Sequence, residues 1–464
     1  MSRPSPNELV PHAAPSRRDV LRSAAAGFGM VALAGLLGLQ ARGTSAAAGP
    51  VTTLAPRPPH ALARAKRIIF LFMEGAMSAV DTFEYKPALQ AWNGRPSPGG
   101  GKLVGSKFSF RQHGQTGSWV SELYPHVARH VDDLCFIRGL HTDTPAHPQA
   151  VIQLHTGARN ASLTRPSLGS WLLYGLGSEN EDLPGYVAIN PAPNFGGAIN
   201  YGNAFLPASF QGTRITDTGE LPNLRAALPR DLQRSQLDLV QRFNRSLQAS
   251  PVAPREIDGV IASAELAFRM QDTVPDLLDV SREPQSVLDA YGVKPGKEGS
   301  FARQCLMARR MSEAGVRFVE IRQPGWDHHN NLHKGLIENA AATDQPTAAL
   351  LADLKQRGLL DDTLVLFGSE FGRLPTAQGE DGRDHNITGY PMWMAGGGVK
   401  RGFSYGGTDE LGIHAVEGRM HTTDLHATLL ALMGLDHERL TYNYAGRDLR
   451  LTDVAGNVIR ELFA

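Results

Sequence analysis

Two kinds of apolar pattern alternate along this chain: short runs in which nearly every residue is apolar, and longer stretches in which apolar residues recur at helical spacing. Short, almost wholly apolar runs are typical of strands covered on both faces, because such strands have no solvent-facing positions to fill with polar residues. The clearest runs are 67–73 (RIIFLFM), 132–140 (DDLCFIRGL), 316–321 (VRFVEI) and 363–369 (TLVLFGS). A fifth apolar segment, YPMWMAGGG, begins at Tyr390.

Helical spacing fills the stretches between these runs. In 300–315, Phe301, Cys305 and Met311 fall on one face, and the pattern ends at Gly315. We expect further helices at 150–157, 222–272, 342–360 and 422–435, and irregular chain at 94–118 and 190–220. This alternation predicts an α/β fold, a doubly wound and mostly parallel sheet with helices on both faces.

The N-terminus carries features of an export signal. Residues 16–22 (SRRDVLR) have the twin-arginine pattern, a weakly apolar run follows at 24–39, and Ala46 to Ala48 offer a cleavage site. The run has 16 residues, four of them glycine, so it is too short and too weak for a stable membrane span. We expect 1–48 to be a twin-arginine signal that exports the folded protein to the periplasm or beyond; the alternative is an uncleaved amphipathic tail.

The remaining chain divides into two parts. Residues 49–63 form a Pro-rich linker, and we expect 64–464 to form one α/β domain, since no composition break divides it. Lysine plus arginine and aspartate plus glutamate each number 46, so no basic surface favours a nucleic acid partner. The two cysteines, Cys135 and Cys305, lie in apolar segments, and we expect buried, inert thiols.

Acids and histidines follow the strand-like runs at the points where the runs end. Because the carboxyl ends of parallel strands lie along one edge of a sheet, residues far apart in sequence are expected to converge there. The residues in question are Glu74; His141, Asp143 and His147; Asp327, His328 and His329; Glu370; and Asp384 with His385. Carboxylates and imidazoles in mixed sets bind divalent metal ions, and the sequence does not distinguish zinc, manganese, calcium or magnesium.

Each of these motifs also has a purely structural interpretation. The segment GWDHHNNLH, which contains Asp327, matches no zinc-finger or H-E-x-x-H spacing and is equally typical of a loop held by hydrogen bonds. Arg373 and Arg383 have the chemistry to bind an oxyanion in bidentate fashion, although solvated arginines are commoner. His426 lies on an apolar helical stripe with Leu429 and Met433, which favours packing over metal binding.

Several segments carry a resemblance to known proteins. TLVLFGSEFG, PMWMAGGGVKRG, DLHATLLALMGL and TPAHPQAVIQLHTG resemble segments of the sulfatase and alkaline-phosphatase superfamily. Residues 16–464 more closely resemble the sulfatase-like domain-of-unknown-function 1501 family of exported bacterial proteins. That closer resemblance is carried by LFMEGAMSAVDTFEYKP, GWDHHNN, GSEFGR, GRDHN, TDLHATLLALMGLDHERLTY and GRDLRLTD.

The superfamily resemblance implies an alkaline-phosphatase-like fold and assigns roles to particular residues. It places Glu74, Asp327, His329, Glu370, Asp384 and His385 at metal-binding positions for one or two divalent ions. His147 falls at or near the nucleophile position, with Thr144 three residues earlier, and both are candidate catalytic residues together with Arg373 and Arg383.

The chain departs from the superfamily pattern at the nucleophile segment and beside one of the metal-binding acids. No cysteine or serine has the C/S-x-P-x-R setting of a formylglycine sulfatase, and Phe371 replaces the histidine or asparagine after the metal acid. The sequence thus supports two hypotheses. One is a periplasmic metal-dependent hydrolase of small-molecule or glycan phosphate or sulfate esters. The other is a non-catalytic binding or assembly protein that has lost the nucleophile, which leaves a protein partner open.

Overall fold

The computed structural model describes residues 54–158, 163–222, 224, 228–248 and 257–464. The expected export signal therefore lies outside the described residues. Of the expected linker, 54–63 form neither helix nor strand. Within the described part of the chain, no helix combines the length and hydrophobicity that a membrane crossing requires.

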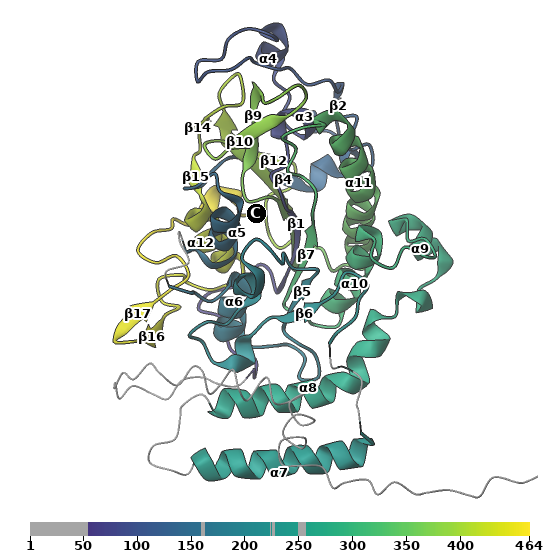
Figure 1. The fold of residues 1–464 in the computed structure, drawn as a ribbon, viewed down its shortest axis with the longest axis vertical. Helices are drawn as coiled ribbons and strands as arrows, with labels where there is room; N and C mark the ends of the chain where they lie inside the picture. Colours follow the sequence, from purple (N-terminus) through teal and green to yellow (C-terminus); the bar gives the residue numbers. More distant parts are fainter. Residues whose placement is uncertain (1–53, 159–162, 223, 225–227, 249–256) are drawn as a thin grey trace, which may run out of the picture.

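A nine-stranded sheet forms the centre of the fold (Figure 1). Its order is β12-β4-β11-β8-β1-β7-β5-β6, and β15 pairs with β4 beside β12. Pairing is parallel throughout except at β11, which runs antiparallel to β4 and β8. The strands are β1 (Arg67–Met73), β4 (Leu134–His141), β5 (Tyr186–Ile189), β6 (Thr213–Ile215), β7 (Phe318–Gln323), β8 (Thr363–Gly368), β11 (Tyr390–Ala395), β12 (Phe403–Tyr405) and β15 (Met420–His421). The predicted mostly parallel α/β architecture is confirmed.

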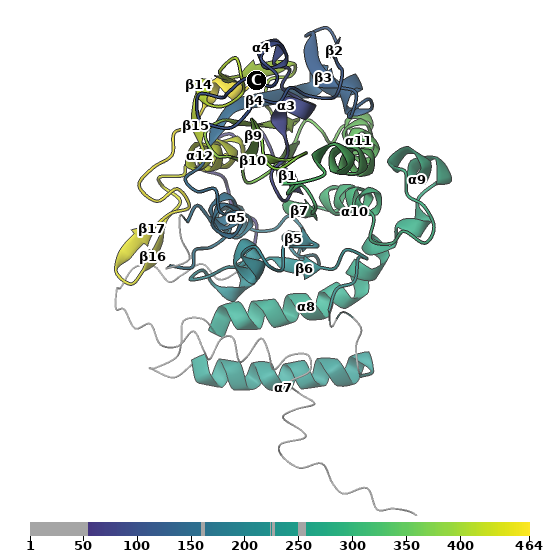
Figure 2. The ribbon, with the colours of Figure 1, turned by 45° about the horizontal axis from the view of Figure 1, so that its top comes forward.

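Helices cover both faces of this sheet, and β1 shows why. Its side chains alternate between two separate apolar cores, with Ile69 and Leu71 in one and Phe70 and Phe72 in the other. Each fully buried side chain of this kind stabilises the fold by about 1.5–3 kcal/mol. One core packs under α10 (Phe301–Glu313) and α11 (Leu332–Gln356); the other packs under α5 (His147–Thr156), α6 (Leu168–Leu176) and α12 (Thr422–Leu432) (Figure 2).

Several short elements were not expected from the sequence. The edge strand β6 lies in the stretch 190–220, and the hairpin of β2 (Phe110–His113) and β3 (Ser118–Ser121) overlaps the end of the expected loop 94–118. These strands have three or four residues and polar members, too little for a period to appear. The other short elements are α3 (Ala79–Thr82), α4 (Pro87–Ala91), α9 (Gln285–Tyr291), β13 (Gly407–Thr408), β14 (Ala415–Glu417), β16 (Tyr442–Tyr444) and β17 (Arg447–Leu449).

A hairpin of β9 (Gly372–Ala377) and β10 (Arg383–Asn386) lies outside the main sheet and follows β8. The zone expected to be helical at 222–272 contains α7 (Arg230–Gln248) and most of α8 (Ile257–Leu278), which lie side by side at one end of the molecule (Figures 1 and 2).

Candidate metal centre

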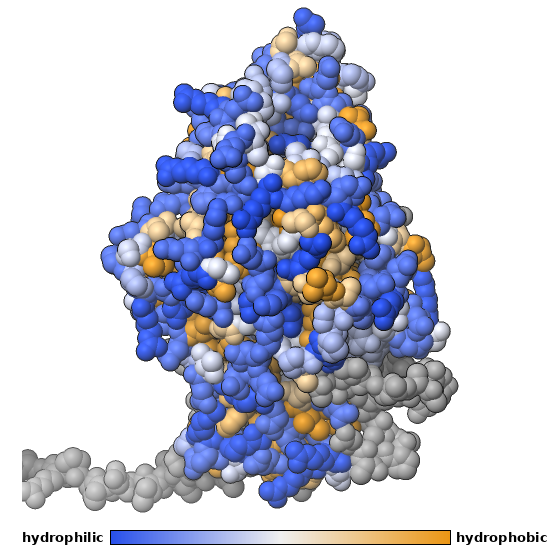
Figure 3. Space-filling view, turned by 180° about the vertical axis from the view of Figure 1, so that it is seen from behind, coloured by the Kyte–Doolittle hydropathy of each residue, from blue (hydrophilic) through white to orange (hydrophobic). Residues whose placement is uncertain are grey.

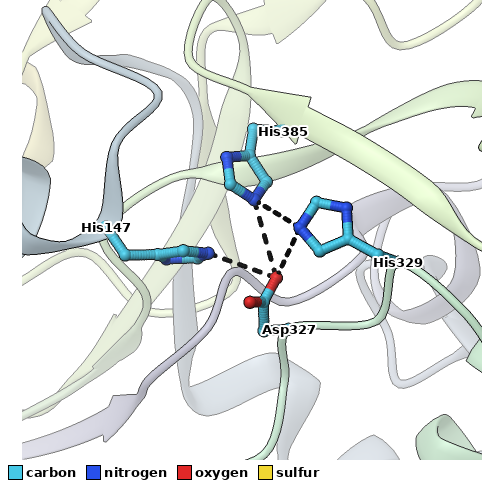
Figure 4. A group of neighbouring side chains, drawn as sticks. All are labelled: His147, Asp327, His329 and His385. Atoms are coloured by element: carbon cyan, nitrogen blue, oxygen red, sulfur yellow. Dashed lines mark hydrogen bonds and ion pairs between the residues drawn. The ribbon is translucent and has the colours of Figure 1, made fainter.

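Four side chains from three distant segments meet at the carboxyl edge of the sheet (Figure 4). Asp327 and His329 lie in the segment that follows β7, and His385 lies in β10. His147 is the first residue of α5, where Pro148 at the second position favours the helix start. In Figure 4 all four side chains point toward one another.

The donor atoms occupy the space of one small ion. Asp327 Oδ1 lies 2.8 Å from His329 Nε2, 3.2 Å from His147 Nε2 and 3.5 Å from His385 Nε2. The Nε2 atoms of His329 and His385 are 2.9 Å apart. Ligands held about 2.0–2.1 Å from a tetrahedral metal lie about 3.3 Å from one another, close to these spacings.

Each imidazole is anchored through its other nitrogen. His147 Nδ1 lies 2.6 Å from Glu370 Oε1, His385 Nδ1 lies 2.6 Å from the Pro145 carbonyl, and His329 Nδ1 contacts Gln378 Oε1. With these oxygens as acceptors, Nδ1 carries a proton, so a ring without a second proton presents its Nε2 lone pair to the centre. Second-sphere acceptors of this kind orient histidine ligands in metalloproteins.

His147 is the most deeply placed of the three histidines. Its side chain is 8% exposed, and its buried Nε2 atom lies 3.2 Å from Asp327 Oδ1. Burial opposes protonation of this ring, but the carboxylates of Asp327 and Glu370 outweigh burial and raise the pKa of His147 to about 9. Without a cation, Nε2 faces Asp327 Oδ1 at 3.2 Å with a proton between them, and a bound cation would take the place of that proton.

Asp327 is held in its charged form. Burial favours its neutral form, yet hydrogen bonds from His147, His385 and Arg373 outweigh burial, so the pKa of Asp327 is lowered. Its side chain is 42% exposed, so one side of the carboxylate faces solvent. The centre is therefore open to small molecules on this side.

Two glycines permit the close approach of the segments that form the centre. A Cβ on Gly75, which has φ +113° at the end of β1, would lie 2.5 Å from the backbone nitrogen of Asp327. A Cβ on Gly382 would lie 1.9 Å from the carbonyl oxygen of His329. Any side chain at either position would push the loop of Asp327 and His329 out of place.

The two glutamates expected as metal ligands have other partners. Glu74 forms a two-point ion pair with Arg322 of β7, with Nε 2.7 Å from Oε2. Glu370 contacts a donor residue and not the centre itself. It accepts a hydrogen bond from His147 and another, at 3.0 Å, from the backbone N–H of Gly75. Glu74 and Glu370 thus lie outside the group of four donors, although the resemblance places both at metal-binding positions.

Asp384 and Thr144 also lie apart from the four donors. Asp384 is exposed and accepts a hydrogen bond from the backbone N–H of His385, its neighbour. The hydroxyl of Thr144 accepts from the Ala146 N–H just before α5. Both side chains shape the turns that present His385 and His147.

The two arginines expected to bind an oxyanion are buried and already occupied. Arg373 donates to the carbonyl oxygens of Gly75, Ala76 and Arg383 and forms an ion pair with Asp327. Arg383 forms a buried two-point pair with Asp81 and donates to the Val104 carbonyl. Neither guanidinium presents a free donor edge, because the β9–β10 hairpin turns both side chains inward.

The remaining histidines of the strand ends belong to other contacts. His421 caps α12 and lies 3.2 Å from Asp143 Oδ2, with the His141 ring 5.3 Å away. His328 is buried, and burial is the main cause that lowers its pKa to about 4. His426 is 1% exposed and donates to the Leu154 carbonyl at 2.7 Å, as its apolar stripe predicts.

The family model described as "Protein of unknown function (DUF1501)" matches residues 65–463, so the chain belongs to this family. A search of the curated proteins finds no match.

Solved structures similar to this one include the lipoteichoic acid synthase LtaP of Listeria monocytogenes, with 10% identity, 81% of this chain and 73% of the other covered, and a TM-score of 0.38. The PsFucS1 sulfatase of Pseudoalteromonas sp. has 15% identity, 84% and 72% coverage and a TM-score of 0.37. An alkaline phosphatase superfamily protein of Vibrio parahaemolyticus has 10% identity, 89% and 78% coverage and a TM-score of 0.38. At these TM-scores the similarities carry no argument about the reaction.

Proposed function

For this member of a family of unknown function, we propose a metal-dependent hydrolase of phosphate or sulfate esters that works in the periplasm or outside the cell. Its divalent cation is held by His147, Asp327, His329 and His385. One observation supports this proposal above all others: three imidazole Nε2 atoms, each fixed through Nδ1, converge on one carboxylate oxygen.

The donor set favours one kind of metal. Three nitrogens and one oxygen suit zinc or another late first-row ion, whereas magnesium and calcium prefer oxygen ligands throughout. The nearby carboxylates of Glu74 and Glu370 are engaged by Arg322 and His147. One ion per chain is therefore the stoichiometry that the described residues support.

The chain's own residues have defined tasks in this proposal. When bound, the ion supplies Lewis-acid chemistry toward an ester oxygen and water. Glu370 keeps the proton on His147 Nδ1, which directs the Nε2 lone pair inward. Arg373 fixes the orientation of Asp327 through their ion pair. The exposed side of Asp327 admits substrate and water.

Water is the proposed attacking group. Among the described residues, no serine, threonine or cysteine side chain hydrogen-bonds to the four donors. The sequence also has no C/S-x-P-x-R segment that would supply a formylglycine. A substrate ester, of a small molecule or a glycan, would thus be cleaved without a covalent intermediate on the protein.

One observation favours the alternative of a non-catalytic, metal-containing binding or assembly protein. Arg373 and Arg383 are 1% exposed and their donors contact protein oxygens, so neither is free to stabilise the charge that develops on an ester group. Both proposals require the metal, but only the hydrolase should turn over an ester substrate.

The test measures metal content and turnover on the same preparations. We expect about one zinc-like ion per wild-type chain by elemental analysis, and metal-dependent hydrolysis of p-nitrophenyl phosphate or sulfate. His147→Ala and His329→Ala should lose both. His414→Ala is the matched control, since His414 is exposed and its ring hydrogen-bonds to Thr388, outside the centre. Bound metal without turnover on any ester supports the binding protein, and a wild type that binds no metal refutes both proposals.

A further inference from the structure

Helix α7 buries its more polar side and exposes its more apolar side. Toward α8 it buries Gln233 and Gln241, with Leu237 between them as the one large apolar residue. On the opposite side Leu232, Leu239, Val240 and Phe243 are 49%, 52%, 46% and 64% exposed. A surface helix normally has the reverse arrangement.

The four exposed residues form one continuous stripe. At 100° per residue, Leu232, Leu239 and Phe243 project within about 40° of one another, and Val240 borders them. In Figure 3 this end of the molecule, where Figure 1 places α7, is mainly hydrophilic, with separate apolar side chains at its surface. Contiguous apolar surface on a soluble protein marks an interaction site.

The inner side of α7 is fixed to α8, so the helix cannot roll to cover its stripe. Arg234 pairs with Glu265 at 2.8 Å, and Gln241 donates to the Ile261 carbonyl at 3.2 Å. Arg230 lies 4.0 Å from the centre of the Phe268 ring. These contacts hold the apolar stripe outward.

Charges beside the stripe indicate what covers it. Asp231 and Arg242 flank the stripe on the same side, about three turns apart, and neither has an ion-pair partner within the described parts of the chain. When two copies of one helix pack antiparallel about a two-fold axis, equal flanks face each other. Asp231 then approaches Arg242 of the partner subunit, and the same pair forms again at the other end.

We propose that α7 is a homodimerisation surface, in which the α7 helices of two copies pack antiparallel against each other. The stripe supplies the apolar centre of the interface, with Phe243 as its largest anchor. The two pairs between Asp231 and Arg242 of the partner subunit set the antiparallel direction.

The experiment uses the mature full chain in sedimentation velocity and in size-exclusion chromatography with light scattering. We expect a dimer, and we expect Leu239→Glu with Phe243→Glu to weaken the dimerisation constant by about 30-fold or more. Val416→Glu is the matched control, because Val416 is 62% exposed on β14 and lies outside α7. Circular dichroism and metal content should stay at wild-type values in all variants.

A charge swap tests the direction of packing. Asp231→Arg alone and Arg242→Asp alone each place like charges together and should weaken the dimer, whereas the double variant should restore it. A monomeric wild type at high micromolar concentration would overturn the proposal, as would a dimer that α7 variants leave unchanged. Binding of a monomer to phospholipid vesicles through Phe243 would also overturn it, in favour of a lipid surface.

Discussion

His385→Ala and His426→Ala should affect opposite properties of the protein. His385 donates through Nδ1 to the Pro145 carbonyl and directs Nε2 to the candidate centre, and its side chain is 15% exposed. Its removal should lower metal affinity by orders of magnitude, because one of four donors is lost. The metal-free protein should lose only about 0.5–1.5 kcal/mol of unfolding free energy, the net value of one hydrogen bond.

His426→Ala should instead destabilise the fold and keep the metal. The ring is 1% exposed, and its Nε2 donates to the Leu154 carbonyl, which joins α12 to α5. A cavity and an unpaired carbonyl together should cost about 2–4 kcal/mol. For a chain of this size, that loss lowers the melting temperature by roughly 3–5 °C.

The assay separates the two effects by measuring each variant twice. Thermal unfolding in excess chelator reports the stability of the metal-free fold without the contribution of ligand binding. Elemental analysis of protein reloaded with zinc reports the centre. Loss of metal in His426→Ala with retention in His385→Ala would refute the assignment of the centre.

Three further predictions concern other parts of the molecule. Glu370→Gln should weaken metal binding about 10- to 100-fold in a competition titration with a chromogenic chelator, because the carboxylate that orients His147 loses its charge; unchanged affinity would argue against that role. Burial lowers the pKa of His426 to about 4, so between pH 6.5 and 4 the unfolded state binds the proton of this ring more readily than the folded state. As the pH is lowered through that window, the free energy of unfolding should therefore fall by up to roughly 3 kcal/mol. Chemical denaturation should show a weaker pH dependence of stability for His426→Gln, and an equal slope would contradict the assignment. Replacing Arg17 and Arg18 by lysines should leave precursor in the cytoplasm on immunoblots of cell fractions, and normal periplasmic accumulation would exclude the twin-arginine route.

The strands that could be predicted are those whose own residues form a clear apolar run. β1 and β8 are almost wholly apolar because helices cover both faces of the sheet, so their runs stand out in the sequence. β6 and β10 have three and four residues and include charged side chains, and their pairing depends on neighbours that no local pattern reveals. Their existence follows from tertiary contacts alone.

The same distinction holds at the candidate centre. That Asp327, His329 and His385 meet follows from strand ends sharing one edge, which the sequence pattern indicates. The pairing of Glu74 with Arg322 depends on β1 lying beside β7 in one register, and the inward turn of Arg373 depends on the β9–β10 hairpin. His147 was expected as a catalytic residue at or near the nucleophile position, and its position opposite Asp327 indicates a metal donor instead.

The wide separation of the donors along the chain has a kinetic consequence. His385 contacts the Pro145 carbonyl across 240 residues of chain, so the centre forms only after the sheet has brought distant segments together. The unfolded chain offers just Asp327 and its close neighbours to a cation, and their affinity is correspondingly weak. A bound cation would therefore act as a late, reversible cross-link that closes a very long loop, and would slow unfolding more than it speeds folding.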